Sequence, residues 1–123
     1  MCDLSMQRNN QRLMRLLPDG VSVHYFDHHK VDQGTVHPML DVHIDVASDS
    51  CTSLLTDRYL HGEFRGWAIV GIFGDNLTTV AEGLAIALGL SFEDRRRLQP
   101  LGESTNYNAY GASRILTSTR TVV

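Results

Sequence analysis

The sequence predicts an α/β fold in which helices flank a parallel sheet. The first observation is a strand-like run, residues 21–26, which follows a helical pattern and the turn Pro18-Asp19-Gly20. The second is the nearly continuous apolar run Trp67–Phe73, typical of a strand buried on both faces of a parallel sheet. Because helical patterns separate these runs, we expect a parallel arrangement of the strands.

Composition limits the class of protein. The chain has 123 residues, 42% hydrophobic and 20% charged, which is enough for one domain with a core and argues against disorder. A net charge of −3 gives no global electrostatic reason for tight binding to duplex DNA. The cysteines, Cys2 and Cys51, have no paired metal-site spacing, and no apolar stretch reaches membrane-spanning length. With no signal-peptide layout at the N-terminus, we expect a cytoplasmic protein with reduced thiols.

The first segments are expected to form a strand end followed by a helix. Met1–Ser5 is interpreted as the end of a strand, with Ser5 as a helix N-cap. A helix over Met6–Leu17 would then end at the Pro-Asp-Gly turn. It would bury one stripe of leucines and expose one stripe of arginines to water. The stripes are Leu13, Leu16 and Leu17, and Arg8, Arg12 and Arg15.

The tripeptide Asp27-His28-His29 ends the second strand-like run. Successive side chains alternate faces along a strand, but they can converge where the strand ends and the chain turns. Imidazole binds divalent transition metals, and a carboxylate either binds the metal or orients an imidazole. In a parallel sheet, Asp3 and the tripeptide both lie at carboxyl ends of strands, where α/β proteins place their ligands.

Asp27-His28-His29 after an apolar strand resembles the signature of the DHH phosphoesterase superfamily, which contains manganese-dependent pyrophosphatases, single-strand exonucleases and hydrolases of short RNAs and cyclic dinucleotides. The resemblance implies that Asp3 bridges two metal ions and that His28 is a metal ligand. It further implies that His29 contacts the substrate phosphate and that Asp27 supports the site. The alternative for Asp3 is a carboxylate that only stabilises a helix start.

The middle of the chain alternates between predicted elements. Val42, Ile44 and Val46 alternate with polar residues, as expected for a short strand. A helix is expected to begin in residues 47–53, capped by Asp49 or Ser50, and to end at Gly62. The remaining histidines match no motif position and are interpreted as surface or structural residues; they are His24, His37, His43 and His61.

The apolar run Trp67–Phe73 ends in Gly74-Asp75-Asn76, and a helical pattern follows it. The resemblance implies that this is the family's glycine-containing strand end and that Asp75 is a metal ligand. The alternative is a Gly-Asp-Asn turn without a ligand. Further on, we expect a short helix over residues 91–98, a loop over 102–111 and a poorly structured tail over 112–123.

The resemblance covers residues 1–111, interpreted as a partial DHH catalytic domain. The family's first motif, His-x-x-x-Asp-x-Asp, and its C-terminal substrate-binding domain have no counterpart in this sequence. The resemblance implies a phosphoesterase with two Mn²⁺ ions, or Mg²⁺ in their place, acting on a phosphorylated small molecule or a short single-stranded oligonucleotide. Without the first motif, we expect weak or no turnover. One alternative is a non-catalytic remnant that self-associates through an open sheet edge. Another is a binding module with a single metal site formed by His28, His29 and Asp75.

Overall fold

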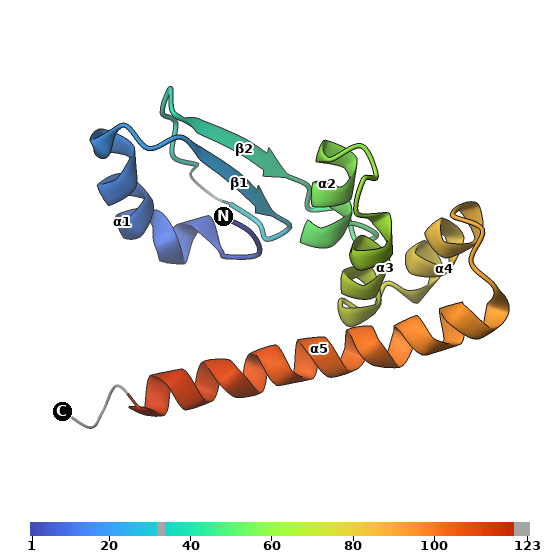
Figure 1. The fold of residues 1–123 in the computed structure, drawn as a ribbon. Coiled ribbons are helices and arrows are strands. Elements are labelled where there is room, and N and C mark those ends of the chain that lie inside the picture. Colours follow the sequence, from blue (N-terminus) through green and yellow to red (C-terminus); the bar gives the residue numbers. More distant parts are fainter. Residues whose placement is uncertain (32–33, 120–123) are drawn as a thin grey trace. The chain divides into compact units, whose positions relative to one another are not determined.

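The computed structural model describes residues 1–31 and 34–119, with side chains described up to residue 107. The chain divides into two compact units, Met1–Gly62 and Glu63–Val123. The first unit contains the sheet, and the described part of the second is helical (Figure 1).

The first unit is built on two parallel strands, β1 (Val23–Asp27) and β2 (Leu40–Ile44), paired from Val23↔Leu40 to Asp27↔Ile44. On the other side of β1, Cys2 forms an isolated parallel bridge with Phe26. There the Phe26 amide donates to the carbonyl of Met1, and the Asp3 amide donates to the carbonyl of Phe26. The predicted α/β class and the strand-like N-terminus are therefore confirmed at this level, with a small sheet.

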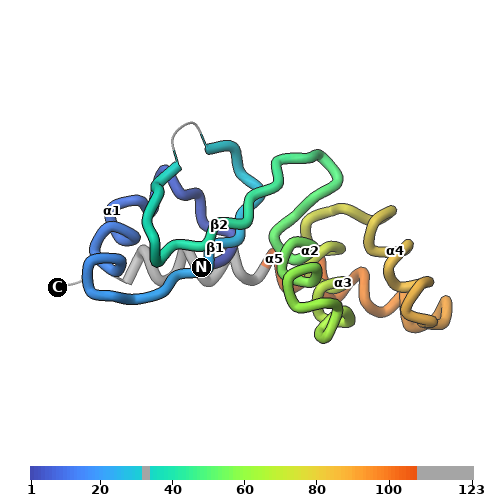
Figure 2. The backbone as a smooth tube through the Cα atoms, turned by 90° about the horizontal axis from the view of Figure 1, so that it is seen from above, coloured from blue at the N-terminus to red at the C-terminus, as the bar shows by residue number. Residues whose placement is uncertain are grey.

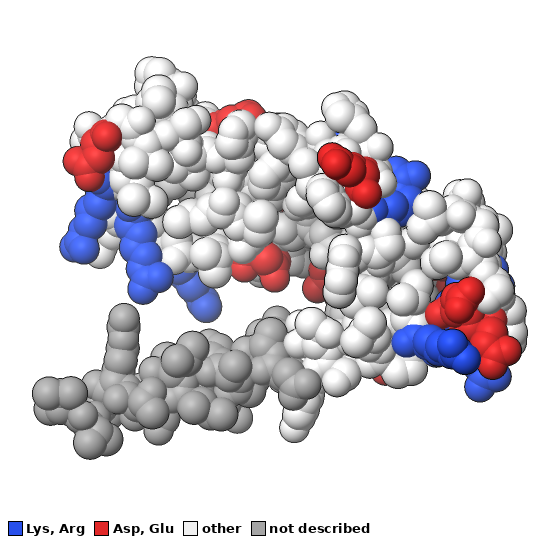
Figure 3. Space-filling view, viewed as in Figure 1, with Lys and Arg blue, Asp and Glu red and all other residues white. Residues whose placement is uncertain are grey.

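Helix α1 (Met6–Leu16) covers one face of the strands and continues into a short 3₁₀ turn, η1 (Leu17–Asp19). Its buried side chains form a core with the side chains of β1 on that face; the set is Met6, Leu13, Leu17, Val23 and Tyr25. The predicted Arg stripe is exposed, and basic side chains gather over α1 in Figure 3. Leu16, expected in the apolar stripe, is 39% exposed because Met6, rather than Leu16, completes the buried face.

Helix α2 (Thr52–Tyr59) contacts β1 on the opposite face. There Tyr59 packs edge-on against Phe26, with ring centroids 5.1 Å apart. The N-cap position is Cys51, without a side-chain cap, so the prediction of Asp49 or Ser50 as cap is wrong. The helix ends through His61 and Gly62, both with positive φ, as predicted for a glycine-terminated helix.

The second unit is formed by α3 (Arg65–Gly74), α4 (Thr78–Ala87) and α5 (Phe92–Thr119), which contact one another (Figure 2). The predicted strand over Trp67–Phe73 is therefore wrong, because this run is α3. Its buried residues are Ile69, Val70, Ile72 and Phe73, a helical spacing, while Trp67 is 74% exposed. A short apolar run fits a buried strand and a buried helix equally well, and here the helix forms.

Two glycines explain how α3 and α5 approach each other. A Cβ added to Gly74 would lie 3.0 Å from the carbonyl oxygen of Gly102, and one added to Gly102 would overlap the carbonyl of Val70. The Asn106 side chain also donates to the carbonyl of Gly74 at 2.8 Å. Gly74 therefore permits close helix packing, whereas the motif resemblance implied that it belongs to a glycine-containing strand end.

Helix α5 extends far beyond the short helix that the sequence predicted. The prediction ended this helix at Leu98, but the helix continues through Pro100 to Thr119. The predicted loop over 102–111 is thus helical, and the predicted poorly structured tail is helical over 112–119. Residues 120–123, the rest of that tail, lie outside the described residues.

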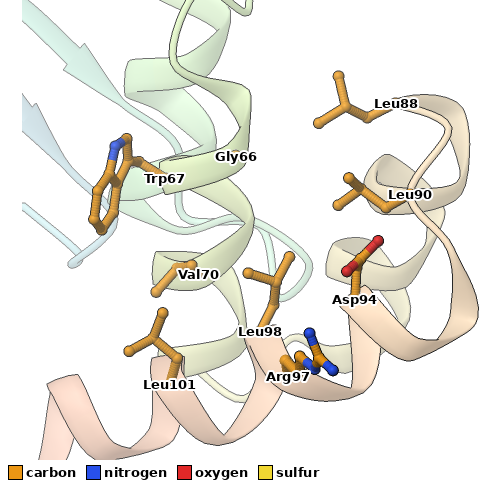
Figure 4. A pocket seen from close by; sticks show the side chains of 9 residues that line it. All are labelled: Gly66, Trp67, Val70, Leu88, Leu90, Asp94, Arg97, Leu98 and Leu101. Carbon is orange, nitrogen blue, oxygen red and sulfur yellow. The ribbon is translucent and has the colours of Figure 1, made fainter.

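An apolar pocket of about 410 Å³ lies within the second unit (Figure 4). Trp67 and Val70 of α3, Leu88 and Leu90 after α4, and Leu98 of α5 line it, with Asp94 and Arg97 also in its wall. Within the described residues, no helix has the length and apolarity needed to cross a bilayer.

Candidate metal centre

Asp3 and the tripeptide Asp27-His28-His29 lie close together, because the N-terminal segment and β1 run parallel and end at the same edge of the sheet. The bridge at Cys2 fixes Asp3 beside the last residues of β1, and Asp27 ends β1 itself. His28 and His29 follow at the point where the chain leaves the sheet. The prediction that Asp3 and the tripeptide share one edge is confirmed by their grouping in this structure.

Asp3 is held by contacts from two other segments. Its Oδ1 lies 3.3 Å from Nε2 of His28 and accepts a hydrogen bond of 3.1 Å from the hydroxyl of Thr52, the first residue of α2. Asp3 has φ +54°, in the left-handed region that Asp and Asn tolerate better than most residues. The side chain is thus placed by a turn after the bridge and by the start of α2. Thr52 was not identified from the sequence.

Asp27 lies beneath the two histidines and is fully buried. Its Oδ1 accepts a hydrogen bond of 2.9 Å from the His28 amide and contacts Nδ1 of His29 at 2.6 Å. A carboxylate only accepts, so Nδ1 of His29 is the donor in this contact, which leaves Nε2 as the nitrogen that can face a ligand. Such a carboxylate–imidazole contact commonly orients a metal-binding histidine, which is the supporting role predicted for Asp27.

Three possible ligand atoms converge above Asp27. Asp3, His28 and His29 each offer one, and all lie within 4.8 Å of one another. The two imidazole rings meet edge to face, with centroids 4.8 Å apart. A carboxylate with two imidazoles suits Zn²⁺, Mn²⁺ or Fe²⁺.

Two buried polar atoms near this centre support the fit of a cation. Within the described residues, Oδ2 of Asp27 and the hydroxyl of Tyr25 have no hydrogen-bond partner. A buried carboxylate oxygen without a hydrogen-bond partner is costly, and a nearby positive charge offsets that cost. The donor set and the buried carboxylate thus both fit a divalent ion.

Tyr25 is a neighbour of the centre that the sequence analysis missed. Burial, followed by the negative charges of Asp27 and Asp3, raises the pKa of Tyr25 to about 12. The phenol is therefore a neutral O–H group at physiological pH. Because Tyr25 and Asp27 are two residues apart on one strand, strand alternation was the signal that could have identified it.

Asp75 has a different structural context from the one expected. It follows α3 as its C-cap residue, and its amide donates to the carbonyl of Gly71. It belongs to the second unit, whereas the converging residues all belong to the first. The strand end that suggested a ligand role for Asp75 is therefore absent from the described fold.

Two of the remaining histidines, His24 and His43, form a second group with Asp41 on the face of the sheet. They were expected to be surface or structural residues without a shared site. His37 accepts a hydrogen bond from the Met39 amide, a local structural role, and His61 lies in the turn after α2.

No known family model, no curated protein and no solved structure matches this chain. Function is therefore inferred from the geometry of the site and from the motif resemblance.

Proposed function

We propose that the chain is a metal-dependent phosphoesterase that hydrolyses a phosphodiester or phosphoanhydride bond at the edge formed by Asp3, His28 and His29. The observation that carries the proposal is the convergence of these side chains above the buried carboxylate of Asp27. The DHH resemblance supplies the reaction class and the preference for Mn²⁺, with Mg²⁺ as a substitute.

Each residue of the proposed site has a separate role. Asp3 and His28 hold the ion, because their ligand atoms already lie 3.3 Å apart. Asp27 fixes the ring of His29 through Nδ1, so Nε2 can contact the ion or a phosphoryl oxygen beside it. A bound divalent ion would polarise the phosphoryl group and acidify the attacking water.

The start of α2 gives the site a second means of holding a phosphoryl group. Thr52 is the first helical residue and contacts Asp3, so the amides at this helix end lie close to the proposed ion. Helix N-termini attract anions through their unpaired amides and the helix dipole. A phosphorylated small molecule or a short single-stranded oligonucleotide fits this arrangement.

Turnover is expected to be weak. The three converging side chains provide ligands for one ion, while two-metal catalysis requires a second set.

Cys2 and Cys51 are thiols, consistent with the proposed cytoplasmic location.

The test is Mn²⁺-dependent hydrolysis of bis(4-nitrophenyl) phosphate. We expect slow hydrolysis that requires Mn²⁺ and is lost in Asp3→Asn and His28→Gln. Asn is suited to the left-handed backbone at position 3, so the first variant should keep the fold. His61→Asn is the matched control, because it removes a histidine outside both groups and should retain the activity. Hydrolysis that is absent at millimolar Mn²⁺, or equal in all variants, would contradict the proposal.

A second candidate is a self-associating, non-catalytic module. Among the described residues, β2 has a strand partner only on its β1 side, so its outer edge is open to pairing. Sedimentation velocity over a range of protein concentrations tests this candidate. A concentration-dependent dimer that lacks metal-dependent hydrolysis would favour it over the enzyme.

A further inference from the structure

The second group of metal-capable side chains lies on the face of the β1–β2 pair, apart from the strand-end residues used above. His24 of β1 is directly opposite Asp41 of β2 in the parallel register. His43 is two residues beyond Asp41, so the pleat directs both toward the same face of the sheet. The register therefore brings together residues that are far apart in the sequence.

The ligand atoms of this group converge. Oδ2 of Asp41 lies 3.1 Å from Nδ1 of His24 and 2.9 Å from Nε2 of His43. All three ligand atoms lie within 4.8 Å of one another. With metal–ligand bonds of about 2.0–2.1 Å, the ligands of a tetrahedral zinc ion are about 3.3 Å apart. Small movements of these side chains would thus accommodate an ion.

Aromatic packing fixes the position of these side chains. The imidazole of His43 stacks on Phe26, with centroids 4.6 Å apart and an interplanar angle of 8°. Tyr59 of α2 packs against His24 and His43, with centroids 5.7 Å and 5.0 Å away. Rings held in this way lose less side-chain entropy when they bind a ligand.

We infer that His24, Asp41 and His43 form a second metal site, which binds Zn²⁺ through three side chains and ties β1 to β2. The Tyr59 hydroxyl lies 3.4 Å from Nδ1 of His24, so it is a neighbour of the proposed site. Since each strand has only five residues, a cross-strand ion would stabilise a short sheet.

The experiment separates this site from the strand-end centre. Zn²⁺ is titrated by calorimetry into the wild-type protein, the Asp41→Asn variant and the Asp3→Asn/His28→Gln variant. We expect two equivalents in the wild type and one in each variant, with none when all three substitutions are combined. Asp41 is exposed, so the isosteric change should leave the fold intact, which far-UV circular dichroism checks.

A second readout tests the structural role. In the Asp3→Asn/His28→Gln background, Zn²⁺ should raise the unfolding temperature and slow hydrogen exchange of the β1 and β2 amides. Asp41→Asn or His24→Gln should remove both effects, while His61→Asn should retain them. Zinc binding and stabilisation that are unchanged by Asp41→Asn and His24→Gln would overturn the second site. If wild-type protein binds one equivalent and Asp41→Asn removes it, the second site stands and the strand-end centre fails.

Discussion

The two units of the chain differ in the side chains that they bring together: Asp and His in the first unit, Gly and apolar residues in the second. In the first, the sheet brings Asp and His side chains together at the ends and on one face of its strands. In the second, α3 and α5 meet through glycines and apolar side chains, and no metal-capable group occurs among its described residues. Among the described residues, the side chains that could hold a metal ion therefore all lie in residues 1–62.

The two units also differ in the free-energy cost of the side chains that they bury. Asp27 is a buried carboxylate in the first unit, whose cost must be offset by hydrogen bonds and by positive charge. The second unit buries Ile69, Val70, Ile72 and Phe73 without such a cost. We therefore expect substitutions at the contact of α3 and α5 to change stability, and substitutions of Asp3, Asp27 or His28 to change metal affinity.

The largest effect is expected for Gly102→Ala. The added methyl group would overlap the carbonyl of Val70 and lie 2.9 Å from the amide nitrogen of Gly74, both backbone atoms of α3. We predict a loss of about 3 kcal/mol in the free energy of unfolding, measured by urea denaturation. Gly83→Ala is the matched control: it faces open space within α4 and should stabilise the protein by about 0.5–1 kcal/mol. Equal changes in the free energy of unfolding for the two variants would refute the claim that α3 and α5 pack closely at Gly102.

Asp27→Asn is expected to have the next largest effect. The amide side chain keeps the volume and still accepts a bond from the His28 amide, but it lacks the charge that orients His29. Loss of such a supporting carboxylate commonly lowers metal affinity about 10–100-fold. Calorimetric titration with Mn²⁺ measures the change. Asp19→Asn, an exposed carboxylate after α1, should leave the affinity unaltered.

Tyr25→Phe should change the free energy of unfolding by less than Gly102→Ala does, and in the opposite direction. It removes a buried hydroxyl that has no partner among the described residues, so we expect unchanged stability or a gain of up to about 1 kcal/mol at neutral pH.

The raised pKa of Tyr25 also predicts a pH dependence. Between pH 10 and about 12, the folded state keeps this proton while the unfolded state ionises, so stability falls as pH rises through this window. Urea denaturation at pH 7 and pH 11 should therefore show a smaller alkaline loss in Tyr25→Phe than in the wild type. An equal loss in both proteins would exclude Tyr25 as its source.

The smallest effect is expected for Asp75→Asn. The sequence analysis placed Asp75 among the metal ligands, which predicts a large loss of Mn²⁺ affinity. Asp75 instead follows helix α3 as its C-cap residue, so the strand end that suggested a ligand role is absent, and we predict no measurable change. Calorimetry on this variant, alongside Asp27→Asn, distinguishes the two predictions.

The sequence predicted the first unit well, because its signals are local and physically specific. The Pro-Asp-Gly turn, the leucine spacing of α1 and the polar residues ending β1 each indicate one structure. The pairing of His24 with Asp41 could not be predicted, since it depends on the register of two strands.

In the second unit the signals were ambiguous. The run Trp67–Phe73 fits strand or helix, and only its packing through Gly74 and Gly102 favours the helix. The helix predicted over residues 91–98 extends through Pro100 to Thr119, and it packs along α3.

The central claim is that Asp3 and His28 hold a divalent ion at the strand ends of the first unit. The most direct measurement is calorimetric titration of Mn²⁺ into the wild-type protein and into the Asp3→Asn/His28→Gln variant. The account predicts saturable binding in the wild type and at least about a 100-fold weaker affinity in the variant, since two ligands are removed. Identical isotherms, or no binding by the wild type at millimolar Mn²⁺, would contradict it.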